Sequence, residues 1–353
     1  LGLLNGMKAR GITAEVTIMT PTGDIPAHLK GKIAAAVPMR MKAVFSALRG
    51  SDAFIICGGT MFHDAYPDDR HRGYRLVLAK LAGLCTAARL LGCRVGLIGV
   101  GIGPLKRPFT KRMTAIALKR CTGIAVRDGA SVDDVLAVAP GTNPLHAHDL
   151  SLMSSHAPDQ DADRRVVLSI VPSALVSTVS DADAGAFAQR LPVAIGRALQ
   201  SHPDVQLTVF VVNQGAHDGD HAVSEAFFEA LPQEIQKRTQ LLPFDGNPES
   251  YVTAMSGAVA IIATRFHIAM VGSVLRRPTL WLPYQRKVID GARSLGVDEQ
   301  AICLLTGISG ADAVGRKLSK ILDGEALPAP TRLGMAQAEA DRNTDALAQV
   351  LRA

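Results

Sequence analysis

The residues best suited to chemistry lie together in the segment 258–287. An apolar, strand-like run at 258–263 is followed by Arg265, Phe266 and His267, at the point where a helix is expected to begin. An arginine and a histidine at a helix N-terminus place a permanent cation, a titratable imidazole and backbone N–H groups around one point. Such a point can bind an anion and transfer a proton. The segment therefore predicts chemistry on a phosphorylated or carboxylated small molecule.

Two further cations are expected at the ends of strands. Arg127 ends the run 123–127, where its planar guanidinium could bind a phosphate or a carboxylate. The alternative for Arg127 is a surface turn with Asp128. Lys287 follows the next apolar run after the histidine, together with Tyr284. Ligands of parallel sheets bind outside the carboxyl ends of the strands, so all these residues are candidates for a site.

Two glycine-rich loops also follow predicted strands. Gly58 and Gly59 would let a backbone approach a ligand closely, and Asp64 could cap the turn or orient a hydroxyl. The second loop, GVGIGP, contains Gly101 and Gly103. It is similar to a dinucleotide-binding fingerprint, but its spacing is GxGxG and no acidic residue ends the next strand, so we predict no nicotinamide cofactor. The absence of a GxxxxGK[ST] motif excludes a P-loop.

The composition excludes several other classes of protein. A net charge of +6 over 353 residues, with four Tyr and one Trp, argues against a dedicated nucleic-acid binder. Five cysteines without CxxC spacing fit a reducing cytoplasm, with neither zinc nor disulfides. His146 and His148 share one face of a strand but lack a third ligand, so no metal site is predicted. No apolar run reaches the roughly 18 residues of a membrane span.

One segment is strongly basic. Residues 106–120 contain six Lys and Arg and no Asp or Glu. This segment is either the solvated face of a helix or a peripheral contact with anionic lipids at the inner face of the membrane.

Alternating strand-like and helix-like segments predict the fold class. Runs rich in Val and Ile, separated by helix-length segments, favour parallel sheets covered on both faces. A polar stretch at 154–165 is the predicted linker. We therefore expect an α/β protein with two Rossmann-like, doubly wound domains that face a central cleft. The expected domains are 1–155, whose first strand is expected to precede this sequence, and 165–353.

Taken in order, these motifs resemble the polysaccharide pyruvyl transferase family. The matching elements between residues 51 and 297 are GGTMFHD, GVGIGP, VRDGAS, HDLSL, the long segment FDGNPESYVTAMSGAVAIIATRFHIAMVGSVLRRPTLWLPYQRK, and SLGV. The most specific match is Arg265-Phe266-His267, followed by Pro278 and the Tyr284-x-x-Lys287 element. Phe266 stands where a leucine is common in this family.

The resemblance implies a GT-B-like fold and a ketal-forming transferase. Phosphoenolpyruvate would be the donor, with no other cofactor and no metal, and the acceptor would be a sugar of an exopolysaccharide or its lipid-linked precursor. The domain 1–155 would hold the acceptor and the domain 165–353 the donor. His267 would be the general acid, and the donor site would contain Arg265, Phe266, Arg127 and Lys287. Candidate acceptor or loop contacts are Gly58, Gly59, Asp64, Gly101, Gly103 and Tyr284.

The residues support this chemistry independently, because an imidazole with a pKa of about 6.5 can protonate the methylene carbon of an enol phosphate near neutral pH. Two alternatives stay open. A nucleotide-sugar glycosyltransferase of GT-B architecture would use the same cations to bind a diphosphate. An inactive relative would act as a scaffold in glycan assembly.

Overall fold

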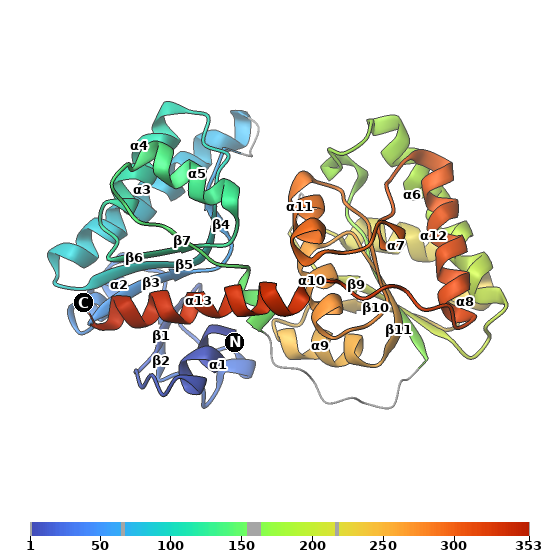
Figure 1. The fold of residues 1–353 in the computed structure, drawn as a ribbon, viewed down its shortest axis with the longest axis horizontal. Coiled ribbons are helices and arrows are strands. Elements are labelled where there is room, and N and C mark those ends of the chain that lie inside the picture. Colours follow the sequence, from blue (N-terminus) through green and yellow to red (C-terminus); the bar gives the residue numbers. More distant parts are fainter. Residues whose placement is uncertain (1, 65–67, 154–163, 216–218, 353) are drawn as a thin grey trace. The chain divides into compact units, whose positions relative to one another are not determined.

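The structure is a computed structural model that describes residues 2–64, 68–153, 164–215 and 219–352. The chain divides into two compact units, and each is described by itself (Figure 1). Unit 1 contains residues 1–155 and 334–353, and unit 2 contains residues 156–333.

Unit 1 is built around a parallel sheet in the order β3-β5-β6-β7, with β4 also paired to β5. Its strands are β3 (Ala53–Cys57), β4 (Thr60–Phe62), β5 (Arg94–Ile102), β6 (Gly123–Val126) and β7 (Leu145–His146). A separate parallel pair consists of β1 (Thr17–Thr20) and β2 (Ala35–Pro38). The central strand β5 is buried along nearly its whole length, as expected for a parallel strand covered on both faces.

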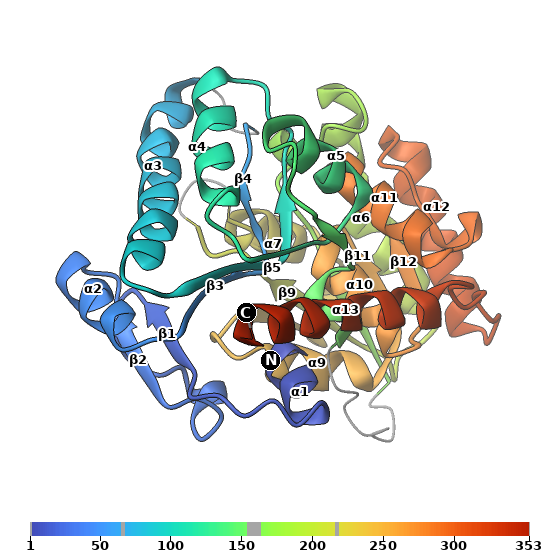
Figure 2. The same cartoon turned by 60° about the vertical axis from the view of Figure 1, so that its left-hand side comes forward.

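Helices cover both faces of this sheet. Side chains of one face pack with α2 (Met41–Arg49), α3 (Asp68–Leu90), α4 (Pro108–Leu118) and α5 (Gly129–Val138). Those of the other face, including Ile98 and Ala125, pack with α1 (Gly2–Ala9) and α13 (Leu333–Arg352). Figure 2 shows α3 and α4 side by side and α13 (red) along the opposite side of the sheet.

The C-terminal helix differs from the prediction. We expected residues 334–353 in the C-terminal domain, but α13 belongs to unit 1. The reason is burial of an apolar stripe, because Ala346 and Leu347 pack against β5 and β6. The buried side chain of Asn343 also donates a hydrogen bond from Nδ2 to the carbonyl of His148 at 2.8 Å. Together these contacts fasten the end of the chain to unit 1.

Unit 2 contains a second parallel sheet, in the order β10-β9-β8-β11-β12. Its strands are β8 (Arg165–Ser169), β9 (Gln206–Val211), β10 (Thr239–Pro243), β11 (Ala258–Ala263) and β12 (Thr279–Trp281). Along the chain, β9 and β10 are added on one side of β8, and β11 and β12 are then added on the other side. This reversal between β8 and β11 is the topological switch point where doubly wound sheets bind their ligands.

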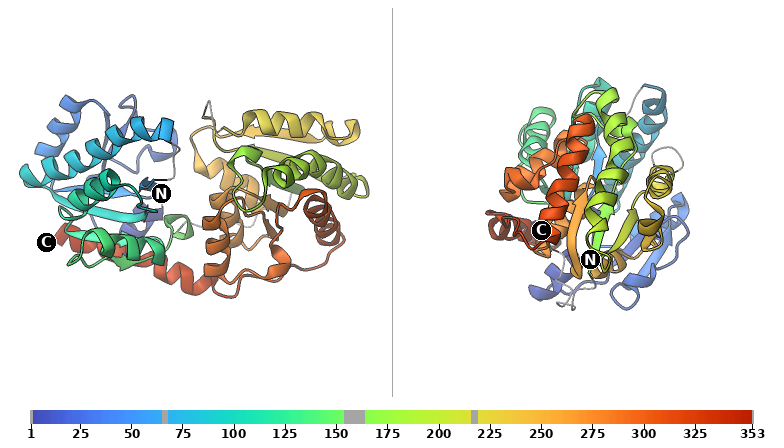
Figure 3. Two further views of the ribbon diagram at one scale, coloured as in Figure 1. Left: turned by 90° about the horizontal axis from the view of Figure 1, so that it is seen from above. Right: turned by 90° about the vertical axis from the view of Figure 1, so that its right-hand side faces the viewer.

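The helices of unit 2 connect these strands. They are α6 (Asp181–Gln200), α7 (His221–Glu229), α8 (Gln233–Gln236), α9 (Pro248–Ser256), α10 (Phe266–Val274), α11 (Arg286–Leu295) and α12 (Gly307–Leu322). The right-hand panel of Figure 3 shows α6 and α12 side by side. They approach closely because Gly315 has no side chain, and a Cβ there would lie 2.8 Å from the carbonyl oxygen of Ala194. Among the helices of the described residues, none is long and apolar enough to cross a membrane.

Candidate active site

The segment 264–267, which contains Arg265 and His267, lies at the topological switch point of unit 2. The N–H and the hydroxyl of Thr264 both donate to the carbonyl of Ser169, each at 3.0 Å, so the carboxyl ends of β11 and β8 are held together. Arg265 then adopts an extended conformation as the N-cap of α10, and the helix begins at Phe266. Arg265 and His267 therefore lie at the site where a doubly wound sheet offers its ligand-binding edge.

Arg265 is held by an aspartate from another loop. Its Nε donates to Oδ2 of Asp220 at 2.9 Å, and its Nη2 donates to the other carboxylate oxygen, which makes the pair bidentate. The Asp220 side chain is completely buried, whereas that of Arg265 is 17% exposed. Asp220 is itself anchored, because the N–H of Asn213 donates to its Oδ2 at 3.0 Å. The pair fixes the plane of the guanidinium at the carboxyl edge of the sheet.

His267 and Phe266 form the first turn of α10. The imidazole is exposed, and the Phe266 ring meets it edge-on with the ring centroids 5.4 Å apart. The Phe266 ring in turn packs on α11 at Gly291, where a Cβ would lie only 2.4 Å from the ring. A glycine in α11 thus makes room for the ring that supports the imidazole.

Lys287 lies near this turn along the sheet. β12 pairs directly with β11, with Ala263 opposite Trp281, so the loops after the two strands leave the same edge. Lys287 is exposed at the beginning of α11, with its Nζ 5.5 Å from the centroid of the Tyr284 ring. The Tyr284 side chain is buried and its carbonyl accepts the N–H of Ser177 at 2.8 Å. Tyr284 therefore supports the lysine in this structure, whereas the sequence made it a candidate acceptor contact.

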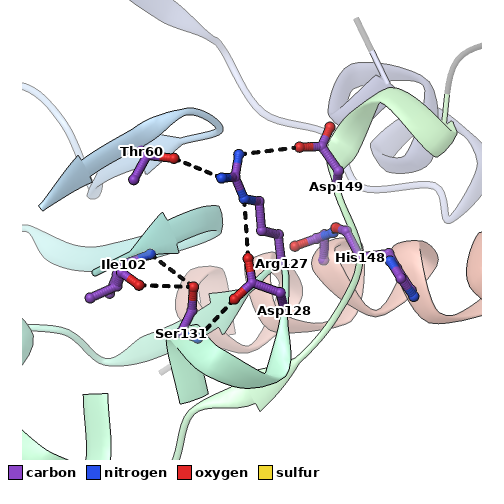
Figure 4. Close-up of polar contacts among 8 residues, drawn as sticks. Thr60, Ile102, Arg127, Asp128, Ser131, His148 and Asp149 are labelled. Carbon is purple, nitrogen blue, oxygen red and sulfur yellow. Dashed lines mark hydrogen bonds and ion pairs between the residues drawn. The ribbon is translucent and has the colours of Figure 1, made fainter. Parts of the chain in front are cut away.

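Arg127 lies in unit 1, at the end of β6, and its side chain is largely buried (Figure 4). Its Nη2 donates to the Thr60 hydroxyl at 2.8 Å, its Nη1 lies 3.6 Å from Oδ2 of Asp149, and its Nε lies 3.4 Å from Oδ2 of Asp128. A Cβ at Gly101 would lie 2.7 Å from its Nε. Gly101 therefore leaves space for the guanidinium, which links β4, β6 and the turn after β7.

Asp64 has a capping role. Its Oδ2 accepts the N–H groups of Lys106 and Arg107 at 2.6 and 2.7 Å, and its Oδ1 accepts the Thr110 hydroxyl at 2.5 Å. Burial would raise the pKa of this carboxyl, but the hydrogen bonds from Thr110, Arg107 and Lys106 outweigh it and lower the pKa below its usual value. Asp64 thus stabilises the start of α4, whereas the sequence analysis considered it as a cap of its own turn or as a contact for a ligand hydroxyl.

The glycines of the two loops in unit 1 allow backbone conformations and close contacts that a side chain would prevent. Gly58 and Gly59 follow β3 with φ of 66° and 68°, a left-handed conformation that favours glycine. Gly59 is exposed and a Cβ there would meet nothing within 4 Å, so this turn is open to a ligand. Gly103, in contrast, is closed off, because a Cβ there would lie 1.7 Å from Oδ2 of Asp134.

No metal site is present among the described residues. They contain no group of three or more His, Cys, Asp or Glu side chains that could hold a metal ion. The ring centroids of His146 and His148 are 5.7 Å apart, and Nε2 of His148 lies 3.3 Å from Oε2 of Glu339 in α13. Burial lowers the pKa of His148. The two histidines therefore belong to the contact between β7 and α13.

Asp220 is the residue that sequence reasoning missed. Nothing in the spacing of the polar loop 213–220 points to Arg265, 45 residues later. The loop follows β9, a strand adjacent to β8, but it contains Asp218 as well as Asp220, so the sequence does not single out Asp220. Asp149, which also contacts Arg127, accepts the Ser151 N–H on its Oδ1 at 2.9 Å.

The fold of the whole chain is similar to that of several sugar-nucleotide enzymes. A UDP-GlcNAc 2-epimerase from Methanocaldococcus jannaschii has a TM-score of 0.61 at 10% identity, covering 98% of this chain and 95% of the other. A UDP-GlcNAc 2-epimerase from Neisseria meningitidis has a TM-score of 0.59 at 11% identity, covering 100% and 95%. A UDP-forming trehalose-phosphate synthase from Burkholderia xenovorans has a TM-score of 0.50 at 13% identity, covering 99% and 95%. The α/β fold with parallel sheets, of the GT-B-like class, is thus confirmed.

The sequence defines the family within this class. Residues 1–286 match the polysaccharide pyruvyl transferase family, so the chain belongs to it. The predicted family is confirmed, and with it the general class of transferase. The match includes Arg127, Arg265 and His267 and ends one residue before Lys287. Comparison with curated protein sequences gave no match.

Proposed function

We propose that this chain transfers the pyruvyl group of phosphoenolpyruvate to a sugar and forms a pyruvate ketal. The main support is the position of His267, exposed in the first turn of α10 at the switch point of a chain in the polysaccharide pyruvyl transferase family. The acceptor is a sugar of a cell-surface polysaccharide or of its lipid-linked precursor. The protein works in the cytoplasm, where phosphoenolpyruvate is available.

The donor is bound at the carboxyl edge of β11 and β12. Phosphoenolpyruvate carries a phosphate and a carboxylate, and both groups are bound by cations and by backbone N–H donors. Arg265, held by Asp220, and the exposed Lys287 supply positive charge, and the first turn of α10 supplies N–H groups. Phe266 keeps the imidazole of His267 in place by packing on Gly291.

The reaction begins with a proton transfer. Protonated His267 gives its proton to the methylene carbon of the enol phosphate, which becomes a methyl group and leaves cationic character on the adjacent carbon. One sugar hydroxyl attacks that carbon, and a second replaces the phosphate, which leaves as inorganic phosphate. The two hydroxyl protons restore the imidazolium and protonate the phosphate. The cations stabilise the departing anion, and this route needs neither a metal nor an organic cofactor.

The role of the unit 1 residues follows from their contacts. Gly58 and Gly59 are the proposed acceptor contacts, because their turn is open at the carboxyl end of β3. Arg127 was expected to bind the donor, and the family resemblance still supports that role. Its contacts with Asp128, Asp149 and Thr60 favour a second role, in which Arg127 stabilises the loops at the carboxyl edge of the unit 1 sheet.

A direct assay tests the proposal. The full chain is incubated with phosphoenolpyruvate and a panel of nucleotide-linked and lipid-linked sugars, and we expect phosphate release together with an acid-labile ketal whose methyl group is visible by NMR. The His267→Ala variant should lose both products. Turnover with a nucleotide sugar as donor, and none with phosphoenolpyruvate, would reject the proposal in favour of a glycosyltransferase. An unchanged level of pyruvylated glycan in cells carrying His267→Ala would favour a scaffold.

A further inference from the structure

The charges of this chain are segregated along the sequence. Residues 70–127 contain thirteen Lys and Arg but no Asp or Glu, whereas the rest of the chain has a net charge of −7. The overall charge of +6 therefore conceals one strongly basic segment. This segment includes α3 apart from its first two residues, Asp68 and Asp69, together with β5, α4 and β6. Because the two strands are largely buried, most of its charge lies on the helices.

The two helices present this charge on one side of unit 1. α3 and α4 pack side by side over the same face of the sheet (Figure 2). We define the basic face as six exposed cations of α3, of α4 and of the C-cap residue of α4, which are Arg72, Arg75, Lys80, Lys111, Arg112 and Lys119. Arg89, near the end of α3, is also exposed but is not counted in this face. Within the described part of the chain, none of the six forms an ion pair with a carboxylate. The acidic residues Asp133 and Asp134 of α5 mark its border.

Apolar side chains are interspersed with these cations. Leu76 and Leu90 of α3 are 59% and 83% exposed. Leu76 lies one helical turn from both Arg72 and Lys80, so the three share the outward stripe of α3. Such a mixture is typical of surfaces that lie on a bilayer, where cations meet head groups and apolar side chains enter the boundary with the acyl chains.

Nucleic acid fits this face less well. Stacking of bases needs exposed aromatic rings. Two aromatic side chains of the described part of α3 and α4, Tyr74 and Phe109, are partly buried. The Arg75 guanidinium also covers the Phe109 ring, at 4.4 Å from the centroid. The face therefore offers charge and aliphatic surface, a combination that suits lipid.

We propose that the basic face binds the anionic head groups of a lipid bilayer and holds unit 1 at the membrane as a peripheral contact. Each cation near an anionic surface adds to the attraction, which is screened by salt within about 10 Å at 0.1 M ionic strength. The contact is made by α3 and α4, and the proposed chemistry by α10 and α11 of unit 2. Membrane binding needs neither phosphoenolpyruvate nor a sugar, so it can be tested apart from pyruvyl transfer.

Flotation with vesicles tests this proposal. The full chain is mixed with vesicles of phosphatidylcholine alone or with 30% phosphatidylglycerol, a composition chosen for the experiment as roughly that of an anionic leaflet. We expect binding to the anionic vesicles only, with affinity falling as salt rises. The triple variant Lys80→Glu, Lys111→Glu, Arg112→Glu should bind at least about tenfold more weakly. A second variant, Leu76→Ala with Leu90→Ala, should weaken binding severalfold at high salt, where charge is screened.

A matched control distinguishes the effect of the basic face on vesicle binding from the effect of net charge. Lys8, Lys30 and Lys237 are exposed elsewhere on the two units, and changing all three to Glu alters the net charge equally. This control should keep vesicle binding, and circular dichroism should show that both triple variants are folded. Equal loss in both triple variants, or equal binding to neutral vesicles, overturns the proposal. So does binding of a single-stranded oligonucleotide through the basic face without binding to vesicles.

Discussion

Arg265 and Asp220 form a bidentate ion pair that joins the start of α10 to the loop before α7. The carboxylate is fully buried and the guanidinium lies at the carboxyl edge of the sheet. Because a buried charge without a partner is costly, each member of this pair depends on the other. The pair therefore couples the stability of unit 2 to the position of the proposed donor-binding cation.

Replacement of Asp220 by Asn should test this coupling. We expect a loss of about 1–3 kcal/mol in the free energy of unfolding, because the amide leaves the arginine without its charged partner. The KM for phosphoenolpyruvate should rise, since Arg265 is no longer held. Chemical denaturation and steady-state kinetics measure the two effects.

The control for Asp220 is Asp204→Asn. Asp204 pairs with Arg164 at the surface, where both side chains are 49% exposed, so its loss should cost under about 1 kcal/mol. If Asp220→Asn changes neither stability nor KM, the ion pair has no part in donor binding.

His267 should be required for chemistry more than for binding. His267→Gln keeps a polar side chain in the exposed first turn of α10 but removes the proton donor, so kcat should fall about 100- to 10,000-fold. Binding of phosphoenolpyruvate, followed by calorimetry, should stay within a few-fold. His221→Gln is the matched control, because His221 is an exposed histidine in the first turn of α7. Comparable kcat values for the two variants would exclude the imidazole of His267 as the acid.

The Phe266–Gly291 contact should be sensitive to a single methyl group. A Cβ in Gly291→Ala would lie 2.4 Å from the Phe266 ring, so the ring must move and the variant should lose about 1–3 kcal/mol of stability. Because the same ring supports His267, kcat should fall as well. In the control Gly185→Ala the new Cβ meets nothing within 4 Å, so α6 should be slightly stabilised. Equal melting temperatures for both variants would contradict the packing role of Phe266.

Asp64 should make the protein acid-sensitive. Its pKa is lowered below the usual value of 3.8, so the unfolded state takes up the proton first as the pH falls. The stabilisation is complete well above pH 3.8, begins to fall as the pH approaches that value, and is lost once the pH is below the folded pKa. Asp64→Asn should therefore be less stable at pH 7, by about 1–3 kcal/mol, and should lose less stability on acidification. Denaturation curves between pH 7 and pH 3 measure both, and a parallel pH dependence in the variant would contradict the capping role.

The sequence by itself determined the fold class and the centre of the proposed donor site. Runs of Val and Ile separated by helix-length segments are enough to predict parallel sheets, because a parallel strand must be apolar on both faces. The position of Arg265 and His267 directly after the run 258–263 is enough to place them at a carboxyl edge. These features are local, so they can be read from neighbouring residues.

Only the tertiary structure decided which partners these residues have. Asp220 reaches Arg265 from 45 residues away, and Asp64 caps a helix that begins more than 40 residues later. The helix α13 packs on unit 1, although its sequence follows unit 2 directly. In each case the partner depends on the order of the strands in the sheet and on which face of the sheet a helix covers. Both are decided by packing between residues that are far apart in the sequence, so the spacing of residues along the chain does not predict them.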